Sequence, residues 1–368
     1  MASPEASTAS RDNQPVHAIG WFDGRFGYNV HTRNFFECLS RILPVVASPL
    51  IGHDGPWRED RAALQELPKL LPRASIALLY GDMMDILDGA PGRRIAYTVW
   101  ESTEFPPGWL DKLKRADKIW IPTAWGHSVL IDNGISADQV QVVPEGVDPQ
   151  LFNPEIPPTD ALKAFSGFKF LNVGRFEARK GTQLLIESFD REFGPNDDVR
   201  LVLACDNHHD PEFDIARILR DLWLQRPDRI VVIPPVRSHT RFAELYRACD
   251  AFVSPFRAEG WGLPVSEAMA CGLPVIATNY SGPTGFLDES AYKLSYKLVP
   301  IEDDYYRSAA NVGGFWAEPS RTHLRKLMRE IYENSEESAR RGRAGSRHIL
   351  ENFTWMDAAR TASNLLSD

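Results

Sequence analysis

Residues 250–279 read DAFVSPFRAEGWGLPVSEAMACGLPVIATN, a stretch that contains one complete strand–helix–strand unit. Its two apolar ends, DAFVSPF and LPVIATN, are candidates for buried strands. Between them, Pro264 suits the first turn of a helix, and Gly272 with Pro274 suits its end. We therefore predict a short helix over 264–270, with Glu267 in its first turn.

The same alternation of short apolar runs with segments of helical spacing extends along the chain from residue 16. It predicts α/β architecture with two doubly wound, Rossmann-like domains, and its buried-strand candidates include FKFLNVGR at 168–175 and VRLVLACD at 199–206. In such sheets, ligands lie beyond the carboxyl ends of the strands, so loops after strands in both domains are expected to face a central cleft.

The proline-rich segment after residue 146 predicts a linker between the domains. We expect the chain to divide as follows: a disordered lead-in at 1–15, an N-terminal domain at 16–150, a linker at 151–160, a C-terminal domain at 161–345 and a closing helix at 346–368.

Composition excludes several classes of protein. The 368 residues carry a net charge of −9, so nucleic acid is not an expected partner. No apolar run approaches the roughly 20 residues that cross a bilayer, and the first residues lack the pattern of a secretory signal. The four cysteines are widely spaced among apolar neighbours, which favours reduced thiols in a cytoplasmic protein.

The loop EGWG, which precedes the helix at 264–270, combines glycines with a helix N-terminus. Free backbone N–H groups at such a terminus suit an anion such as a diphosphate. Glu267 could accept hydrogen bonds from a ribose diol, and Glu259 from a second, sugar-like ring. Taken alone, however, Glu267 could simply complement the helix dipole.

A second candidate stretch is GRFEARKG at 174–181, between a strand and a helix. Arg175 and Lys180 would offer an anion a bidentate fork and a point charge. The alternative is a solvated surface loop in which Glu177 pairs with either cation.

Together, GRFEARKG and FRAEGWGLPVSEAMACGLPVIAT, with Glu259 and Glu267 in Glu-x7-Glu spacing, resemble the donor half of glycosyltransferase family 4, which has the GT-B fold. The segment at 121–154 resembles the family's interdomain connection. ENFTWMDAA, from residue 351, resembles its closing helix, which returns to the N-terminal domain.

The resemblance implies retaining, metal-independent transfer of a hexosyl group from a nucleoside diphosphate sugar to a hydroxyl acceptor, with no further cofactor. Arg175 and Lys180 would neutralise the departing diphosphate, Glu267 would bind the ribose, and Glu259 the sugar hydroxyls. Further donor-binding positions are implied at Gly260, Trp261, Gly262, Leu263, Gly282 and, for the base, Val236.

The N-terminal domain offers fewer candidates. Gly24 and Gly27, in DGRFGYN, could let backbone amides approach the donor phosphate, or could simply form a tight turn. Glu101 follows a predicted strand and is a candidate for orienting or deprotonating the acceptor hydroxyl. The family often has a histidine near Glu101, whereas this chain has none there. The family also often has Gly-Gly-x-x-Glu where this chain reads YSGPTGF, which keeps one glycine, Gly282, and no acid.

Two alternatives stay open. An epimerase of the same fold would act on the nucleotide sugar alone, and a binding module would hold it without turnover. The acceptor could be a carbohydrate, a lipid-linked intermediate or a protein, and peripheral contact with a membrane stays open. Donor sugar, base and linkage are not predicted.

Overall fold

The computed structural model describes residues 14–24, 26–50, 71–207, 210–236, 238–303 and 313–367. Most of the expected lead-in, residues 1–13, lies outside this part. The chain divides into two units. Unit 1 comprises Met1–Val99, Phe105–Glu145 and Trp355–Asp368, and unit 2 comprises Trp100–Glu104 and Gly146–Thr354.

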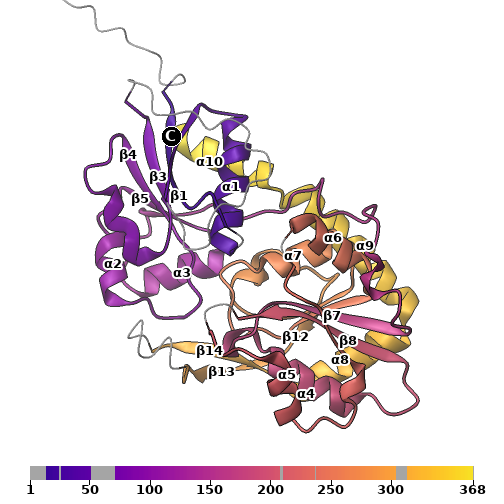
Figure 1. Cartoon of the computed structure of the whole chain (residues 1–368). Helices are drawn as coiled ribbons and strands as arrows, with labels where there is room; N and C mark the ends of the chain where they lie inside the picture. The colour runs from indigo at the N-terminus through magenta and orange to yellow at the C-terminus, as the bar shows by residue number, and fades with distance from the viewer. Residues whose placement is uncertain are drawn as a thin grey trace, which may run out of the picture. The chain divides into compact units, whose positions relative to one another are not determined.

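Unit 1 is built on a six-stranded parallel sheet with the order β2-β1-β3-β4-β5-β6 (Figure 1). Most buried side chains of its central strands β1 and β3 are aliphatic, as expected for a sheet covered by helices. The strands are β1 (Val16–Gly20), β2 (Val45–Pro49), β3 (Ala74–Leu78), β4 (Arg93–Tyr97), β5 (Lys118–Ile121) and β6 (Val140–Val142).

The helices of unit 1 include the last helix of the chain. They are α1 (Gly27–Ser40), the 3-10 helix η2 (Gly81–Leu87), α2 (Pro107–Leu113), α3 (Ala124–Asp132) and α10 (Trp355–Ser367). Figure 1 shows α10 beside α1. Arg73 and Arg93 donate hydrogen bonds to the terminal carbonyls of α10, at Leu366 (2.9 Å) and Leu365 (2.6 Å). Cations at a helix C-terminus stabilise it. The predicted return of the closing helix to the N-terminal domain is thereby confirmed.

Unit 2 has a second six-stranded parallel sheet, with the order β12-β11-β10-β7-β8-β9. Its strands are β7 (Phe168–Arg175), β8 (Val199–Asp206), β9 (Ile230–Val232), β10 (Ala251–Ser254), β11 (Val275–Thr278) and β12 (Tyr292–Leu294). The predicted strands at 168–175 and 199–206 are confirmed residue for residue.

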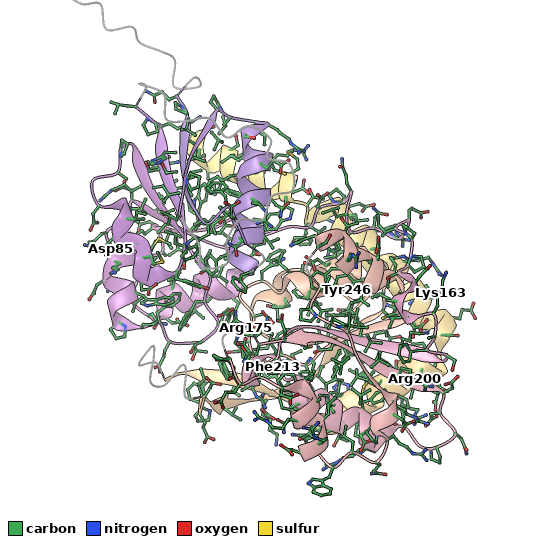
Figure 2. All side chains as sticks on the ribbon, in the orientation of Figure 1. Asp85, Lys163, Arg175, Arg200, Phe213 and Tyr246 are labelled. Carbon is green, nitrogen blue, oxygen red and sulfur yellow. The ribbon has the colours of Figure 1, made fainter. Side chains whose placement is uncertain are left out.

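Helices cover both faces of this sheet (Figure 1). One apolar cluster gathers α6 (His239–Arg247), α7 (Leu263–Ala270) and α9 (Ser335–Asn352), with Tyr246 buried inside it (Figure 2). The other gathers α4 (Thr182–Glu192), α5 (Ile215–Asp221) and α8 (Arg321–Glu333). Short 3-10 helices lie at η3 (Asp160–Leu162), η4 (Ala178–Lys180), η5 (Pro227–Arg229) and η6 (Gly282–Gly285).

Three features differ from the sequence-based expectations. The closing segment is two helices, since Phe353 ends α9 and α10 starts at Trp355. The expected linker contributes to the core of unit 2, where Phe152 packs edge-on against Tyr246. An antiparallel hairpin of β13 (Tyr296–Pro300) and β14 (Phe315–Pro319) was not predicted.

In both sheets the chain reverses its direction of travel once. In unit 1 it moves from β1 to β2 on one side and then continues at β3 on the other, so the reversal lies between β1 and β3. In unit 2 it lies between β7 and β10. Ligands of such folds bind outside the carboxyl ends of the strands at these reversal points.

Candidate functional site: an ion-pair cluster at the reversal point of unit 2

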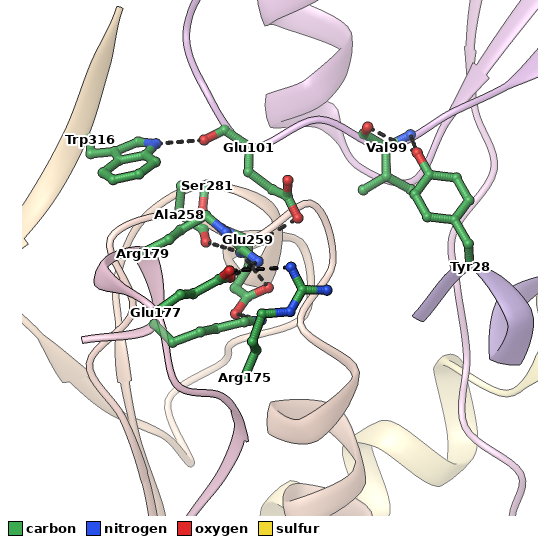
Figure 3. A network of polar contacts seen from close by, with 11 residues as sticks. Tyr28, Val99, Glu101, Arg175, Glu177, Arg179, Ala258, Glu259, Ser281 and Trp316 are labelled. Carbon is green, nitrogen blue, oxygen red and sulfur yellow. Dashed lines mark hydrogen bonds and ion pairs between the residues drawn. The ribbon is translucent and has the colours of Figure 1, made fainter. Parts of the chain in front are cut away.

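The loops that leave β7 and β10 meet at the reversal point of unit 2 and bring together most of the predicted charged residues (Figure 3). A buried amide fixes the two strands there. Asn172 donates to the carbonyl of Val253 (2.7 Å) and accepts from Thr182 at the start of α4 (3.0 Å). The loop positions are therefore set by hydrogen bonds inside the sheet.

Glu259 is the buried centre of the cluster, with only 6% of its surface exposed. Its Oε1 lies 2.5 Å from Lys180 Nζ, and its Oε2 lies 3.2 Å from Arg179 Nη1. Its backbone N–H donates to Ser281 Oγ (2.9 Å), which ties the loop to the segment after β11. A carboxylate so buried is stable only with such cationic partners.

Arg179 is the second buried group, and its role is not predicted by the sequence. Its guanidinium contacts three carboxylates: Glu177 (2.7 Å), Glu259 (3.2 Å) and Glu101 (3.4 Å). It also donates to the carbonyl of Ala258 (2.7 Å). Arg179 therefore joins the loop after β7, the loop after β10 and the segment Trp100–Glu104.

Glu177 bridges the two arginines of the first loop. Its carboxylate contacts Arg175 Nη1 (3.2 Å) as well as Arg179. Burial opposes ionisation, but the charges of Arg179, Arg175 and Lys180 outweigh it and hold the pKa of Glu177 below its ordinary value. Arg175 Nε is buried without a hydrogen-bond acceptor among the described residues. Arg175 is thus incompletely satisfied.

Glu101 joins this cluster through the hairpin as well as through Arg179. Trp316 Nε1, on β14, donates to the carbonyl of Glu101 (2.7 Å), and the N–H of Phe315 donates to Thr103 Oγ1 (2.9 Å). The hairpin therefore holds the residues on both sides of Ser102. Glu101, which was expected in the N-terminal domain, thus lies with the charged residues of unit 2.

Arg257 links the hairpin to the same loops. Its Nε lies 2.6 Å from Glu318 on β14, and its guanidinium also donates to the carbonyl of Ala178. Its backbone N–H donates to the carbonyl of Arg179 (2.6 Å), and its carbonyl accepts from Ala317 (3.0 Å). The cluster is therefore held by the loop after β7, the loop after β10 and the β13–β14 hairpin of unit 2.

Glu267 stands apart from these ion pairs. It accepts a hydrogen bond from the buried Tyr246 hydroxyl (3.0 Å). Burial raises the pKa of Glu267 to about 7, against the opposing effect of that hydrogen bond. Because α7 begins at Leu263, Glu267 is its fifth residue, and the predicted place in the first turn is wrong.

The glycines of the predicted donor loop have clear conformational reasons. Gly262 precedes α7 with φ of +98°, a conformation that favours glycine. Gly282, which follows β11, lies so close to the loop after β10 that a Cβ would be 2.1 Å from the carbonyl oxygen of Gly260. The Trp261 ring packs in the core against Phe286 (4.9 Å between centroids), so this residue could line a ligand site only through its backbone.

Three predicted positions lie elsewhere. Val236 follows β9, the edge strand, and packs against the α6–α7–α9 cluster. Gly27 begins α1 in unit 1, where a Cβ would meet no atom within 4 Å. Gly24 has φ of +123°, and a Cβ there would lie 2.5 Å from Asn29 Oδ1, so the turn before α1 requires glycine at this position.

Comparisons with known proteins find a family match and several relatives for part of the chain. Residues 167–304, which lie wholly in unit 2, match the family described as Glycosyl transferases group 1. A D-inositol 3-phosphate glycosyltransferase of Pseudarthrobacter chlorophenolicus is 32% identical over 155 residues, 40% of this chain and 36% of the relative. A probable sucrose-phosphate synthase of Thermosipho melanesiensis is 27% identical over 233 residues, 62% of this chain and 47% of the relative. The chain spans about a third to a half of the length of these relatives.

Solved structures share the fold over nearly the whole chain. A sucrose-phosphate synthase from Thermosynechococcus elongatus superposes with a TM-score of 0.72 at 18% identity, covering 96% of this chain and 98% of the other. HepE from Anabaena, solved with UDP-glucose, superposes with a TM-score of 0.67 at 15% identity, covering 96% and 100%. The chain therefore has the GT-B fold, and its second unit contains the segment that matches the group 1 glycosyltransferases.

Proposed function

We propose that the protein transfers a hexosyl group from a nucleoside diphosphate sugar to a hydroxyl acceptor, with retention of configuration and without a metal ion. The glycosyltransferase match over 167–304 supports the reaction class. Retention, metal independence and the individual roles of the site residues rest on the family resemblance and on the chemistry of the cluster.

The observation that carries the proposal is the group of cations at the carboxyl end of β7. Arg175 and Lys180 are both partly exposed, and both are paired only with carboxylates in the described part of the chain. Arg175 also has the unsatisfied Nε. A diphosphate offers oxygen acceptors to such groups and can exchange with the carboxylates that pair with them now.

The cluster could stabilise the leaving group directly. In the transfer, the bond between the anomeric carbon and the diphosphate oxygen breaks, and a bond to the acceptor oxygen forms. The proton of the acceptor hydroxyl passes to a base, which the departing phosphate or Glu101 could supply. Negative charge grows on the leaving oxygen, where Arg175 and Lys180 would act, in the role that a metal ion has in other enzymes.

The carboxylates have separate proposed roles. Glu259 would accept hydrogen bonds from the donor sugar and hold Lys180 in place, since its Oε1 is 2.5 Å from Lys180 Nζ. Glu267 would accept from both ribose hydroxyls at once, for which its ionised form offers two acceptor oxygens. Both residues flank the loop 260–263, whose backbone would line the sugar and the phosphates.

The test is a thermal-shift panel of UDP, GDP and ADP and their glucose and mannose derivatives, since a ligand raises the melting temperature by mass action. We expect at least one nucleotide to raise it, and Lys180→Ala to remove most of that shift. Lys163→Ala is the matched control, because its ion pair with Asp160 is 74% exposed at the lysine. A panel without any shift, or an equal loss in both variants, would contradict the proposal.

Turnover separates the two alternative functions. Release of nucleoside diphosphate that depends on an added acceptor supports transfer, whereas an isomerised sugar without any acceptor indicates an epimerase. Nucleotide binding with neither outcome, across a broad acceptor panel, would indicate a binding module. EDTA should leave transfer unchanged if no metal participates.

None of the described helices is long and apolar enough to cross a membrane, and the cytoplasmic location stays a prediction.

A further inference from the structure

One residue beside the ion-pair cluster has a backbone conformation that serine rarely adopts. Ser281, which follows β11 and precedes η6, has φ of +55° and ψ of −147°. In the described part of the chain, Trp223 is the only other non-glycine residue with positive φ, and it lies at an exposed turn. Only glycine reaches the region of Ser281 without a clash of a Cβ. Because Ser281 is also buried, specific contacts have to hold it there.

Those contacts join Ser281 and its neighbours to both backbone polar groups of Glu259. Ser281 Oγ accepts a hydrogen bond from the Glu259 N–H (2.9 Å), and the two residues lie together in Figure 3. The N–H of Gly282 donates to the Glu259 carbonyl (2.9 Å). On the other side, Thr284 Oγ1 donates to the Ser281 carbonyl (2.6 Å), which fixes the strained peptide to η6.

The hydroxyl of Ser281 gives a reason for the strain. Glycine would relax the backbone, but it would leave the buried N–H of Glu259 without this acceptor, and an unpaired buried N–H is costly. The segment has little room to relax by moving, since a Cβ on Gly282 would already lie 2.1 Å from the carbonyl oxygen of Gly260. Strain of this kind persists where the surrounding structure requires the residue.

The residue that Ser281 holds is the one whose position matters most to the cluster. The Glu259 carboxylate lies 2.5 Å from Lys180 Nζ and 3.2 Å from Arg179 Nη1. The loop that follows it contains Gly260 and Gly262, and glycines restrict a backbone least. Such a loop needs contacts from outside to keep a side chain in one place, and small displacements of a functional group are expensive in activity.

We propose that Ser281 is a positioning residue for Glu259. Its hydroxyl holds the backbone of Glu259 so that the carboxylate faces Lys180 and the donor sugar, and the strained backbone of Ser281 is retained for this contact. The inference rests on the proposed function and deepens it, because it assigns to a residue outside the charged cluster the geometry of the sugar-binding carboxylate.

The strain is tested by a pair of variants that both lack the hydroxyl. Ser281→Ala keeps a Cβ in the strained conformation and Ser281→Gly does not, so Ser281→Gly should melt about 3 °C higher than Ser281→Ala. Ser188 provides the matched control, because it is equally buried in unit 2 and makes one hydrogen bond, to Leu184, from inside α4. There the order should be reversed, with Ser188→Gly melting below Ser188→Ala.

The positioning role is tested by calorimetric titration of the full chain with UDP, UDP-glucose, GDP and GDP-mannose. A nucleoside diphosphate does not reach for the sugar-binding carboxylate, whereas its hexose derivative does. Both Ser281 variants should therefore bind the diphosphate as the native chain does and lose roughly fivefold in affinity for the matching nucleotide sugar. A residue that merely stabilised unit 2 would not change the two affinities differently.

The outcomes separate this inference from the proposed function. If the native chain binds a nucleotide sugar and the Ser281 variants bind it equally well, or lose the diphosphate to the same extent, the positioning role is wrong and the donor site stands. If Ser281→Gly melts at or below Ser281→Ala, the strain is absent and the inference fails regardless of binding. If none of the four probes binds the native chain, the proposed function fails and the inference fails with it.

Discussion

The reversal points of the two sheets have the same topology and opposite chemistry. In unit 2 the loops after β7 and β10 bring together the buried Arg179 and Glu259 and the partly exposed Lys180. In unit 1 the rings of Trp21, Tyr28 and Tyr80 gather beside the ends of β1 and β3. The backbone architecture fixes where a ligand can bind. The side chains on the loops then decide which ligand it can be.

The two groups of residues also differ in how they affect the stability of the folded chain. Buried charges must be compensated by partners, so the unit 2 cluster is coupled and one deletion leaves other charges unpaired. Aromatic rings need no partner of opposite charge, so their loss leaves no buried charge unpaired. We therefore expect mutations in unit 2 to be cooperative and mutations of the unit 1 rings to be local.

The largest expected effect is that of Glu259→Ala. It removes the carboxylate shared by Lys180 and Arg179, and should lower the free energy of unfolding by about 3 kcal/mol. Urea unfolding at pH 7 measures it. Glu289→Ala is the matched control, since Glu289 pairs with Lys293 while 97% exposed, and should cost about 0.3 kcal/mol. Equal losses would mean that the unit 2 cluster is not coupled.

A pair of glycine variants probes the loop beside the unit 1 rings. Gly24→Ala forces φ of +123° on a residue with a Cβ and should cost about 2 kcal/mol. Gly27→Ala meets no neighbouring atom at an exposed helix start and should leave stability unchanged or raise it by about 0.5 kcal/mol. Thermal unfolding compares them. If Gly27→Ala also reduces the nucleotide-induced shift, the predicted approach of a phosphate to this loop gains support.

The pH dependence of stability should distinguish Glu267 from the paired glutamates. Burial raises its pKa to about 7 in the folded state, so between pH 4.5 and 7 the folded chain binds more protons than the unfolded chain. Stability from this group therefore falls as pH rises through that window. Glu267→Gln should remove the decline, a difference on the order of 1 kcal/mol. The prediction would be refuted if the free energy of unfolding changed by the same amount between pH 4.5 and pH 7 in Glu267→Gln and in the native chain.

The smallest expected effect concerns competition inside the cluster. Glu177 stays ionised at neutral pH because Arg179, Arg175 and Lys180 lower its pKa despite burial, and it pairs with the arginine that we assign to the diphosphate. Glu177→Gln should therefore raise UDP affinity by roughly threefold in titration calorimetry. Asp198→Asn, at an exposed pair with Arg200, should have no effect. Weaker binding in Glu177→Gln would show that Glu177 supports the site.

The sequence predicted strands of unit 2 well where apolar runs were continuous. Thus β7 and β8 have the predicted bounds. The hairpin was not predicted because Lys297, Pro300 and Glu318 interrupt its apolar pattern, and its pairing spans a long connection. Its contacts with Glu101 depend on residues more than 200 positions away, which local patterns do not contain.

The candidate site was predicted in part for the same reason. Arg175, Lys180 and Glu259 stood out beside glycines and strand ends, and the structure brings Lys180 and Glu259 into direct contact. Arg179 was overlooked because an arginine in ARKG is typical of an exposed loop. Only the fold, which brings the carbonyl of Ala258 to within 2.7 Å of it, reveals that Arg179 is buried.

The docking of α10 on unit 1 has a consequence for how the chain is made. Its terminal carbonyls are held by Arg73 and Arg93, and the Trp355 ring lies 5.4 Å from that of the buried His31. A ribosome delivers these early residues long before residues 355–367, and domains otherwise fold in the order of synthesis. In a nascent chain, the surface of α1 that binds α10 therefore stays uncovered until residues 355–367 have been synthesised.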